Sequence, residues 1–274
     1  MKDAPQLLTS TEAAEFLGAS PTSIKRWADE GILPCVRTAG RHRRFSVEDL
    51  ERFRRERMGA PEPESPAEGV EAWIEDLVEG RPYRVQARLF EARSELGSWR
   101  AVCDRVGEIV TVLGDKWSRG ELSVAQEHVA SERLIRALAR VGESLPLPPD
   151  APKALLLTLE QEEHTLGLAL AELALRELGW QPVFAGRGTP LDGLGELVDT
   201  QRIRLVAVSA AVSSNDPELM RRRADELGDV CRKRGIVLVF GGRGAWPEPP
   251  PYGTRLHGFQ RLRDVVPAPD AVRP

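Results

Sequence analysis

Cysteines and long apolar runs are scarce in this chain of 274 residues. The three cysteines, Cys35, Cys103 and Cys231, form no CxxC pair, which argues against a disulfide framework or a thiolate zinc site and leaves them as packing residues. No apolar run approaches the roughly 20 residues needed to span a bilayer, so no membrane partner is expected. The N-terminal residues lack the basic-then-apolar profile of a secretion signal, and we therefore expect a cytoplasmic protein.

The net charge of −4 is small, but its two signs are unevenly distributed. Residues 1–59 hold 11 basic against 9 acidic residues, which leaves 27 against 33 for the rest of the chain. Only this N-terminal segment therefore suits a polyanion such as nucleic acid. The length is too great for one ordinary core and indicates a modular protein.

Two proline-dense stretches, 58–67 and 143–152, predict the domain boundaries, because such segments are poor helix and strand formers. The three expected domains are a winged helix-turn-helix head, a four-helix bundle, and a doubly wound parallel sheet of the flavodoxin-like kind. They span residues 1–58, 68–142 and 153–274. The predicted fold class is thus multidomain, α and α/β.

In the head, two helix starts follow each other closely. Thr9 with Glu12 has the pattern of a capping box, and Ser20 before a proline suits a second N-cap. With Gly18 as the stop between them, the two helices predict a helix-turn-helix. An arginine-rich hairpin turning at Ala39-Gly40 should follow, and then a third helix, capped by Ser46 with Asp49 and ending near Arg57.

The second helix and the hairpin carry the candidate DNA contacts. Ile24 and Trp27 should face inward, so the polar positions of the helix are free to enter a major groove, while the hairpin suits phosphates or a minor groove. The alternative for a basic run alone is a solvated turn. The candidates are Thr22, Ser23, Lys25, Arg26, Arg37, Arg41, His42, Arg43 and Arg44.

The string RTAGRHRRFSVEDLERF resembles the winged-helix heads of the MerR family and its excisionase relatives. The resemblance implies binding to double-stranded operator DNA. One such head reads only a few base pairs, so we also expect self-association into a dimer or tetramer.

Beyond the head, the apolar pattern changes from helical to alternating strands and helices. Helices are predicted at 68–79, 82–96, 98–117 and 123–141, and then at 165–178, 189–200 and 216–234. Near-continuous apolar strands are predicted at 154–159, 182–186, 205–211 and 236–242. Because ligands of a parallel sheet bind beyond the carboxyl ends of its strands, residues that follow these strands are candidates for a site.

His164 follows the first of these strands, inside EEHTLG, with Glu162 placed to orient its imidazole and Gly167 to let a bulky group pass. A lone loop histidine is more often solvated. However, EEHTLG resembles the DxHxxG signature of cobalamin-binding domains, in which the histidine ligates cobalt. Ser209, Gly241 and Gly242 resemble the family's serine and double-glycine positions, which line the slot for the cofactor's detached nucleotide tail. Ser213, just past the strand, could line the slot too. Glu162 replaces the usual Asp, Ala211 a frequent Leu, and the serine-to-glycine separation is long.

Trp117, Glu127 and His128 have the spacing seen in the CarH family of cobalamin-dependent light-sensing repressors. The resemblance implies that Trp117 covers the upper adenosyl group of adenosylcobalamin, while Glu127 and His128 hydrogen-bond its sugar. A core tryptophan and a solvated Glu-His pair are the ordinary alternatives. Where light-sensing members carry a histidine after the tryptophan, this chain has Ser118.

Together these patterns predict a regulator, expected to be a repressor, whose DNA binding and assembly respond to light through the cobalt–carbon bond. An enzyme is not expected. Three alternatives stay open: a light-independent sensor of cobalamin level, a corrinoid methyl carrier, and a MerR-like regulator that has lost its cofactor. A methyl carrier has no use for residues 1–57, which argues against it.

Overall fold

A computed structural model describes residues 7–17, 19–38, 40–57, 66–80 and 82–269. By its internal contacts the chain forms two compact units, and each is described by itself. The first comprises Met1–Glu91 with Ala125–Arg133, and the second comprises Ala92–Val124 with Leu134–Pro274. The predicted turn residues Gly18 and Ala39, and most of the first proline-dense stretch, lie outside the described residues. The three predicted domain boundaries stay a prediction.

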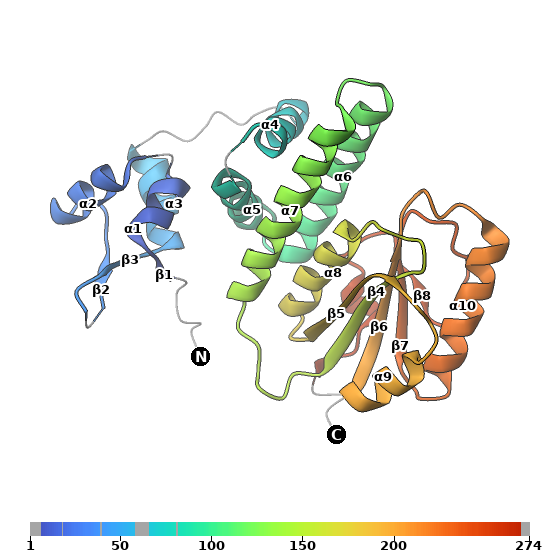
Figure 1. The fold of residues 1–274 in the computed structure, drawn as a ribbon. Helices are drawn as coiled ribbons and strands as arrows, with labels where there is room; N and C mark the ends of the chain where they lie inside the picture. The colour runs from blue at the N-terminus through green and yellow to red at the C-terminus, as the bar shows by residue number, and fades with distance from the viewer. Residues whose placement is uncertain (1–6, 18, 39, 58–65, 81, 270–274) are drawn as a thin grey trace. The chain divides into compact units, whose positions relative to one another are not determined.

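The head consists of three helices and a small antiparallel sheet (Figure 1). The helices are α1 (Ser10–Phe16), α2 (Pro21–Asp29) and α3 (Val47–Arg57). The strands are β1 (Leu7–Leu8), β2 (Val36–Arg37) and β3 (Arg43–Ser46), in the order β1-β3-β2. The predicted helix-turn-helix, hairpin strands and third helix are all present, and only β1 was not predicted, because a two-residue strand has no readable alternation.

The predicted caps of the head are confirmed. Thr9 and Glu12 form a reciprocal capping box, and the Ser20 side chain accepts a hydrogen bond from the Ser23 amide at 3.0 Å. The face of α2 that was predicted to point inward does so, since Ile24 is fully buried and the Trp27 ring lies 5.1 Å from the Phe53 ring. These contacts fix α2 on the head and leave its other face to solvent.

Four helices follow the head, each within a few residues of its predicted bounds. They are α4 (Pro66–Val78), α5 (Pro82–Leu96), α6 (Trp99–Ser118) and α7 (Val124–Ser144). None of the helices within the described ranges combines the length and the apolar character needed to cross a bilayer. The cytoplasmic location stays a prediction.

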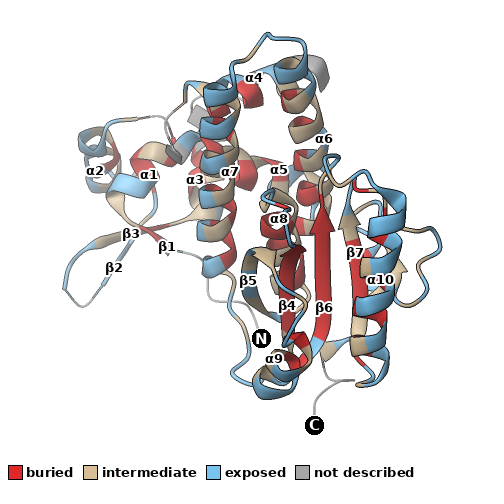
Figure 2. Cartoon of the chain, turned by 45° about the vertical axis from the view of Figure 1, so that its right-hand side comes forward, coloured by how far each residue is buried: buried red, intermediate tan, exposed pale blue. Residues whose placement is uncertain are grey.

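The second unit is built on a five-stranded parallel sheet in the order β5-β4-β6-β7-β8, whose central strands are buried (Figure 2). Its strands are β4 (Lys153–Leu159), β5 (Gln181–Thr189), β6 (Ile203–Ala210), β7 (Val237–Gly242) and β8 (Thr254–Arg255). Its helices are α8 (Leu166–Glu177), α9 (Leu194–Gln201), α10 (Pro217–Arg232) and α11 (Leu262–Val265). The predicted fold class is confirmed.

Two details of the sheet differ from the prediction. The edge strand β5 runs to Thr189 rather than ending at Gly186, because Gly186 and Gly188 adopt positive φ angles of 95° and 61° at irregularities in the strand instead of stopping it. Helix α9 accordingly begins later than expected. The short β8 and α11 were not predicted, since elements of two and four residues carry no periodic signal.

The strand order creates a switch point between β4 and β6. From β4 the chain crosses through α8 to β5 on one side, and later strands are added on the other side of β4. Helices α9 and α10 pack with odd-numbered β4 residues on one face, while α8 packs on β4, β5 and β6. At such a switch point the loops after neighbouring strands diverge and leave a crevice for a ligand.

Candidate cofactor site and nucleic-acid interface

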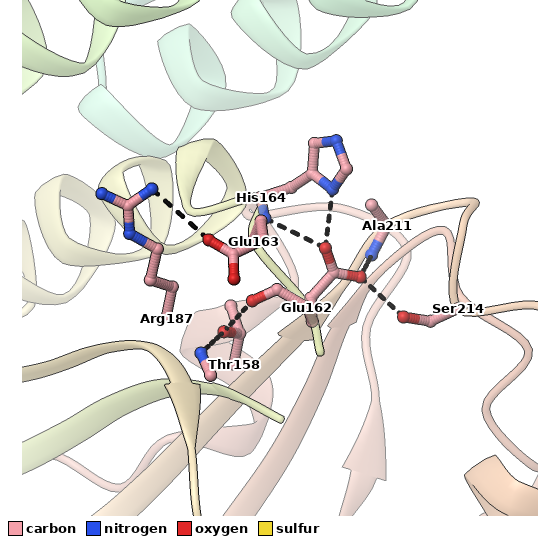
Figure 3. A network of polar contacts seen from close by, with 8 residues as sticks. Thr158, Glu162, Glu163, His164, Arg187, Ala211 and Ser214 are labelled. Carbon is pink, nitrogen blue, oxygen red and sulfur yellow. Dashed lines mark hydrogen bonds and ion pairs between the residues drawn. The ribbon is translucent and has the colours of Figure 1, made fainter. Parts of the chain in front are cut away.

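Glu162 organises the loop that follows β4. Its side chain is only 2% exposed, and its two carboxylate oxygens accept hydrogen bonds from the His164 amide at 3.0 Å, the Ala211 amide at 2.8 Å and the Ser214 hydroxyl at 2.6 Å (Figure 3). His164 Nδ1 lies 2.6 Å from the same carboxylate. Glu162 therefore joins the loops that follow β4 and β6 at the switch point.

This network keeps the carboxylate ionised. Burial alone would oppose ionisation, but the hydrogen bonds from Ser214, His164 and Ala211 outweigh it and lower the pKa of Glu162 below its ordinary value. An ionised carboxylate can only accept, so Nδ1 of His164 carries the proton that it donates to Glu162. In the neutral imidazole the lone pair is then on Nε2.

Nε2 is the atom that a metal would use. The His164 side chain is 66% exposed, and its ring stands above the edge of the sheet with Nε2 directed away from Glu162 (Figure 3). A histidine whose second nitrogen donates to a carboxylate is the usual form of a metal-binding histidine. The predicted Glu162–His164 pair is thus present in the form that the chemistry needs.

A buried threonine fixes the backbone of the same loop. The Thr158 hydroxyl donates to the Glu162 carbonyl at 2.7 Å and accepts from the Gly188 amide at 3.0 Å. Thr158 is fully buried and lies near the end of β4. Sequence reasoning did not single it out, because a threonine in a strand usually serves strand propensity alone.

The serine and glycine candidates also gather at this edge of the sheet. Ser209 of β6 pairs in register with Gly241 of β7, and a β-carbon on Gly167 would lie 2.5 Å from the Ser209 hydroxyl oxygen. Around Gly241 a β-carbon would meet nothing nearer than 3.8 Å, so a methyl group would fit at this position without a clash. Ser213 is exposed, and the serine that contacts Glu162 is its neighbour Ser214, which the sequence did not distinguish.

The residues predicted for the upper face are divided between the two units. Trp117, in the last turn of α6, is 48% exposed and belongs to the second unit. Glu127 and His128, near the start of α7, belong to the first unit; Glu127 accepts a hydrogen bond from the Ser131 hydroxyl at 2.6 Å, and the His128 side chain is 73% exposed. Their convergence with Trp117 stays a prediction.

Helix α6 is fastened to the sheet domain by two carboxylates that sequence reasoning missed. Glu177 of α8 accepts from the Trp99 amide at 2.7 Å and the Arg100 side chain at 2.8 Å, and so caps the start of α6. Asp104 accepts from the backbone amides of Phe259 and Gln260 at 2.5 and 3.1 Å. The helix that carries Trp117 is therefore held to the domain that carries His164.

In the head, most candidate DNA contacts on α2 are exposed. Thr22, Lys25 and Arg26 face solvent, as expected for positions that reach a major groove. The Ser23 hydroxyl lies 2.9 Å from that of Ser20, so it takes part in the cap of α2. The Ser23 hydroxyl is thus already engaged in the helix cap of the free head, whereas the exposed side chains of Lys25 and Arg26 take no part in that cap.

The hairpin arginines fall into two groups. Arg43 and Arg37 donate to Asp29, at the end of α2, over 2.5 and 3.3 Å, and these contacts lower the pKa of Asp29. Asp29 was not predicted as a functional residue, because its partners depend on how the hairpin folds back. Arg43 also belongs to the second group, which lines an open concavity together with Lys25, His42 and two hydroxyl residues at the start of α1. Its lining residues are Thr9, Ser10, Lys25, Arg41, His42, Arg43 and Arg44.

Two family models match separate segments of the chain. The model of a helix-turn-helix domain matches residues 7–58, and that of a B12 binding domain matches residues 70–141. The chain therefore combines a segment that matches a helix-turn-helix domain with one that matches a B12 binding domain, and this combination supports a cobalamin-binding transcriptional regulator. The corresponding parts of the sequence prediction are confirmed.

Individual relatives sharpen this class. The chain is 26% identical to the HTH-type transcriptional repressor CarH of Myxococcus xanthus, over 81% of this chain and 73% of that protein. It is 30% identical to the repressor CarA of the same organism, over 53% of this chain and 48% of that protein. The resemblance to CarH-type regulators is confirmed. A monomethylamine corrinoid protein of Methanosarcina barkeri shares the fold, with a TM-score of 0.56 and 16% identity over 73% of this chain and 98% of that one.

Proposed function

We propose that this protein is an adenosylcobalamin-dependent repressor that binds double-stranded operator DNA as a dimer or tetramer. The observation that carries the proposal is the Glu162–His164 pair at the switch point of the sheet, with the imidazole Nε2 left free for a metal. The matched helix-turn-helix and B12 binding domains supply the two halves of such a regulator. The role is regulatory and not enzymatic.

The residues at the sheet edge fit the lower face of the cofactor. His164 would ligate cobalt, Glu162 would hold its ring, and Gly167 would give the corrinoid room beside α8. Ser209, Ser213, Gly241 and Gly242 would line the slot for the detached nucleotide tail. The lack of close contacts around Gly241 supports this assignment.

On the upper face, Trp117 would pack on the adenosyl group, and Glu127 and His128 would hydrogen-bond its sugar. The support is their spacing and the similarity to CarH. When bound, adenosylcobalamin supplies a cobalt–carbon bond that light can break. A ligand shifts an equilibrium only through its different affinity for two states. The packing of the adenosyl group on Trp117 would therefore favour the arrangement of the chain that is competent to bind DNA.

In the head, the exposed side chains of α2 would read base edges, while Lys25, Arg41, His42 and Arg44 would hold a backbone phosphate in the basic concavity. Arg37 and Arg43 would act differently. Their contacts with Asp29 hold the hairpin against α2, so they position the wing before they touch DNA. The DNA set predicted from the sequence thus divides into contacting and positioning residues.

A light-independent sensor of cobalamin is the second candidate, and Ser118 favours it. Its hydroxyl donates to the Asp115 carbonyl at 2.8 Å within α6, and a hydroxyl so engaged is a poor replacement for a histidine ligand. A corrinoid methyl carrier would need only the cofactor segments. It leaves the helix-turn-helix head at residues 7–58 without a purpose.

One experiment separates these functions. Purified protein is mixed with adenosylcobalamin in darkness, and its absorption spectrum, gel-filtration volume and affinity for DNA selected from random sequences are measured before and after green light. The proposal predicts a bound corrinoid, tight dark-state DNA binding, and loss of that binding after illumination. DNA binding that needs the cofactor but ignores light would favour the sensor of cobalamin level. Protein that retains no corrinoid at saturation would exclude both.

A further inference from the structure

The end of β7 and the turn that follows it are held chiefly by one guanidinium group. Arg255, on β8, pairs in register with Phe240 of β7, and its side chain donates to the carbonyls of Gly241 at 3.0 Å, Gly242 at 2.6 Å and Gly244 at 3.4 Å. The Trp246 indole adds a second donor to the Gly241 carbonyl, at 3.0 Å. Contacts from one side chain to three carbonyls within four residues fix the path of residues 241–244.

Donation to several carbonyls of one turn requires an arginine side chain. A planar guanidinium presents several N–H groups in a rigid fork, whereas a lysine ammonium is a flexible point charge. Burial lowers the pKa of Arg255, and the nearby Glu248 carboxylate, itself 2.7 Å from His257, opposes the shift. The half-buried guanidinium thus donates its hydrogen bonds to backbone carbonyls, and Glu248 acts on it only through its nearby charge.

The turn has one closed side and one open side. On the closed side the Gly244 amide donates to the Ala210 carbonyl at 2.9 Å, and a β-carbon on Gly242 would lie 2.1 Å from that same oxygen. On the open side a β-carbon on Gly241 would meet nothing closer than 3.8 Å. The turn therefore packs tightly against the end of β6, while Gly241 has room for a β-carbon.

The same turn is joined to the histidine loop. The Ala245 amide donates to the Ser214 carbonyl at 2.9 Å, and the Ser214 hydroxyl donates to Glu162, which orients His164. A wall that Arg255 fixes is thus continuous, through hydrogen bonds of described residues, with the group proposed to ligate cobalt.

We infer that Arg255 is a positioning residue that sets the 241–244 turn as one wall of the slot for the nucleotide tail of the corrinoid. The inference rests on the proposed function, because it assumes that His164 displaces the tail from cobalt. Arg255 acts only through the backbone of the turn. Its loss should therefore affect corrinoids that carry the tail and spare those that lack it.

The test compares hydroxocobalamin, which carries the nucleotide tail, with diaquacobinamide, which lacks it. Both are titrated in full-length wild-type protein, Arg255→Gln and Arg255→Lys, with Arg263→Gln on the exposed face of α11 as the matched control. We expect Arg255→Gln to bind hydroxocobalamin about tenfold more weakly, as the loss of a charged hydrogen-bond donor implies, and cobinamide within about twofold of wild type. Arg263→Gln should match wild type with both.

The Lys variant keeps the inference testable if Arg255→Gln does not fold. It retains the charge but not the fork, so it should show the same selective loss in smaller measure. An equal loss for both corrinoids, or no loss for either, would overturn the role of Arg255 while leaving His164 ligation intact. Failure of the wild-type protein to bind either corrinoid would overturn the proposed function itself, and the inference with it.

Discussion

Asp29 in the head and Glu162 in the sheet domain are both carboxylates that hold basic or polar partners, but their settings differ. The Asp29 side chain is 52% exposed and holds two arginines of the hairpin. Glu162 is 2% exposed and contacts two backbone amides, a hydroxyl and an imidazole. An exposed ion pair is screened by water and is worth little, while a buried carboxylate that loses its partners is costly.

The difference suits the two surfaces. A phosphate-binding surface must exchange its internal ion pairs for contacts with phosphates at small cost in free energy, so these ion pairs should be weak and exposed. A metal-binding histidine must keep one tautomer and one orientation, so its partner should be strong and buried. Removing each carboxylate, or the groups beside it, therefore tests the comparison directly.

The largest effect is expected at Glu162. Glu162→Gln places an amide N–H₂ among groups that already donate hydrogen bonds. We therefore expect the free energy of unfolding to fall by about 3 kcal/mol and corrinoid affinity to fall by roughly 10- to 100-fold. Chemical denaturation and spectroscopic titration measure the two effects. Its neighbour Glu163, which is 68% exposed and pairs with Arg187 alone among the described residues, is the control, and Glu163→Gln should change stability by no more than about 0.5 kcal/mol. Equal effects at both positions would refute the contrast.

A smaller effect is expected where α8 passes Ser209. Gly167→Ala forces the Ser209 hydroxyl to move, because the new methyl would lie 2.5 Å from it, and we expect a loss of about 1–2 kcal/mol in stability. Ser209→Ala removes that oxygen and leaves only its β-carbon, at 3.5 Å. The double variant should therefore recover most of the loss in a double-mutant cycle. Additive losses would show that the close approach is not the cause.

The hairpin provides the next comparison. Arg41 lines the concavity and has no carboxylate partner among the described contacts, whereas Arg37 donates to Asp29. Arg41→Gln should reduce the slope of log affinity against log salt concentration by about 0.9, and Arg37→Gln by clearly less. Fluorescence anisotropy with operator DNA over a salt series measures both slopes. A larger change for Arg37 would mean that the Asp29 pair opens completely on DNA.

The smallest effect is expected at Asp29 itself. Asp29→Asn should leave stability nearly unchanged, because exposed ion pairs are screened by water, and it should raise DNA affinity at low salt by freeing Arg37 and Arg43. Glu30→Gln removes the same charge next to it, but among the described residues Glu30 pairs with Arg26 alone, so the gain in affinity should be smaller. If Asp29→Asn weakens DNA binding at every salt concentration, the ion pairs of Asp29 are needed to hold the hairpin in place, and the contrast with Glu162 is wrong.

The sequence predicts those parts of the site that are close together along the chain. Glu162 and His164 are two residues apart, so their pairing could be read from one loop, and the strong apolar strands placed that loop at the sheet edge. The caps at Thr9 and Ser20 were predictable for the same reason, since they depend on residues three positions apart.

Contacts between distant segments were not predictable. Ser214 and Ala211 reach Glu162 from a loop about fifty residues away, and nothing in the sequence distinguishes Ser214 from Ser213. Arg255 lies on a two-residue strand with no periodic pattern, and its role depends on the register of β8 against β7. Asp29 depends in the same way on how the hairpin folds back. Tertiary register, which local propensity does not encode, decides all three.

The central claim is that His164, held by Glu162, supplies the protein's ligand to cobalt. Electron paramagnetic resonance of the protein loaded with cob(II)alamin tests it most directly when the histidines are labelled with the heavy isotope of nitrogen. The account predicts that labelling changes the axial nitrogen splitting from threefold to twofold, and that His164→Ala abolishes the change. A threefold splitting that ignores the label would mean that the cofactor's own base stays on cobalt, which would contradict the account.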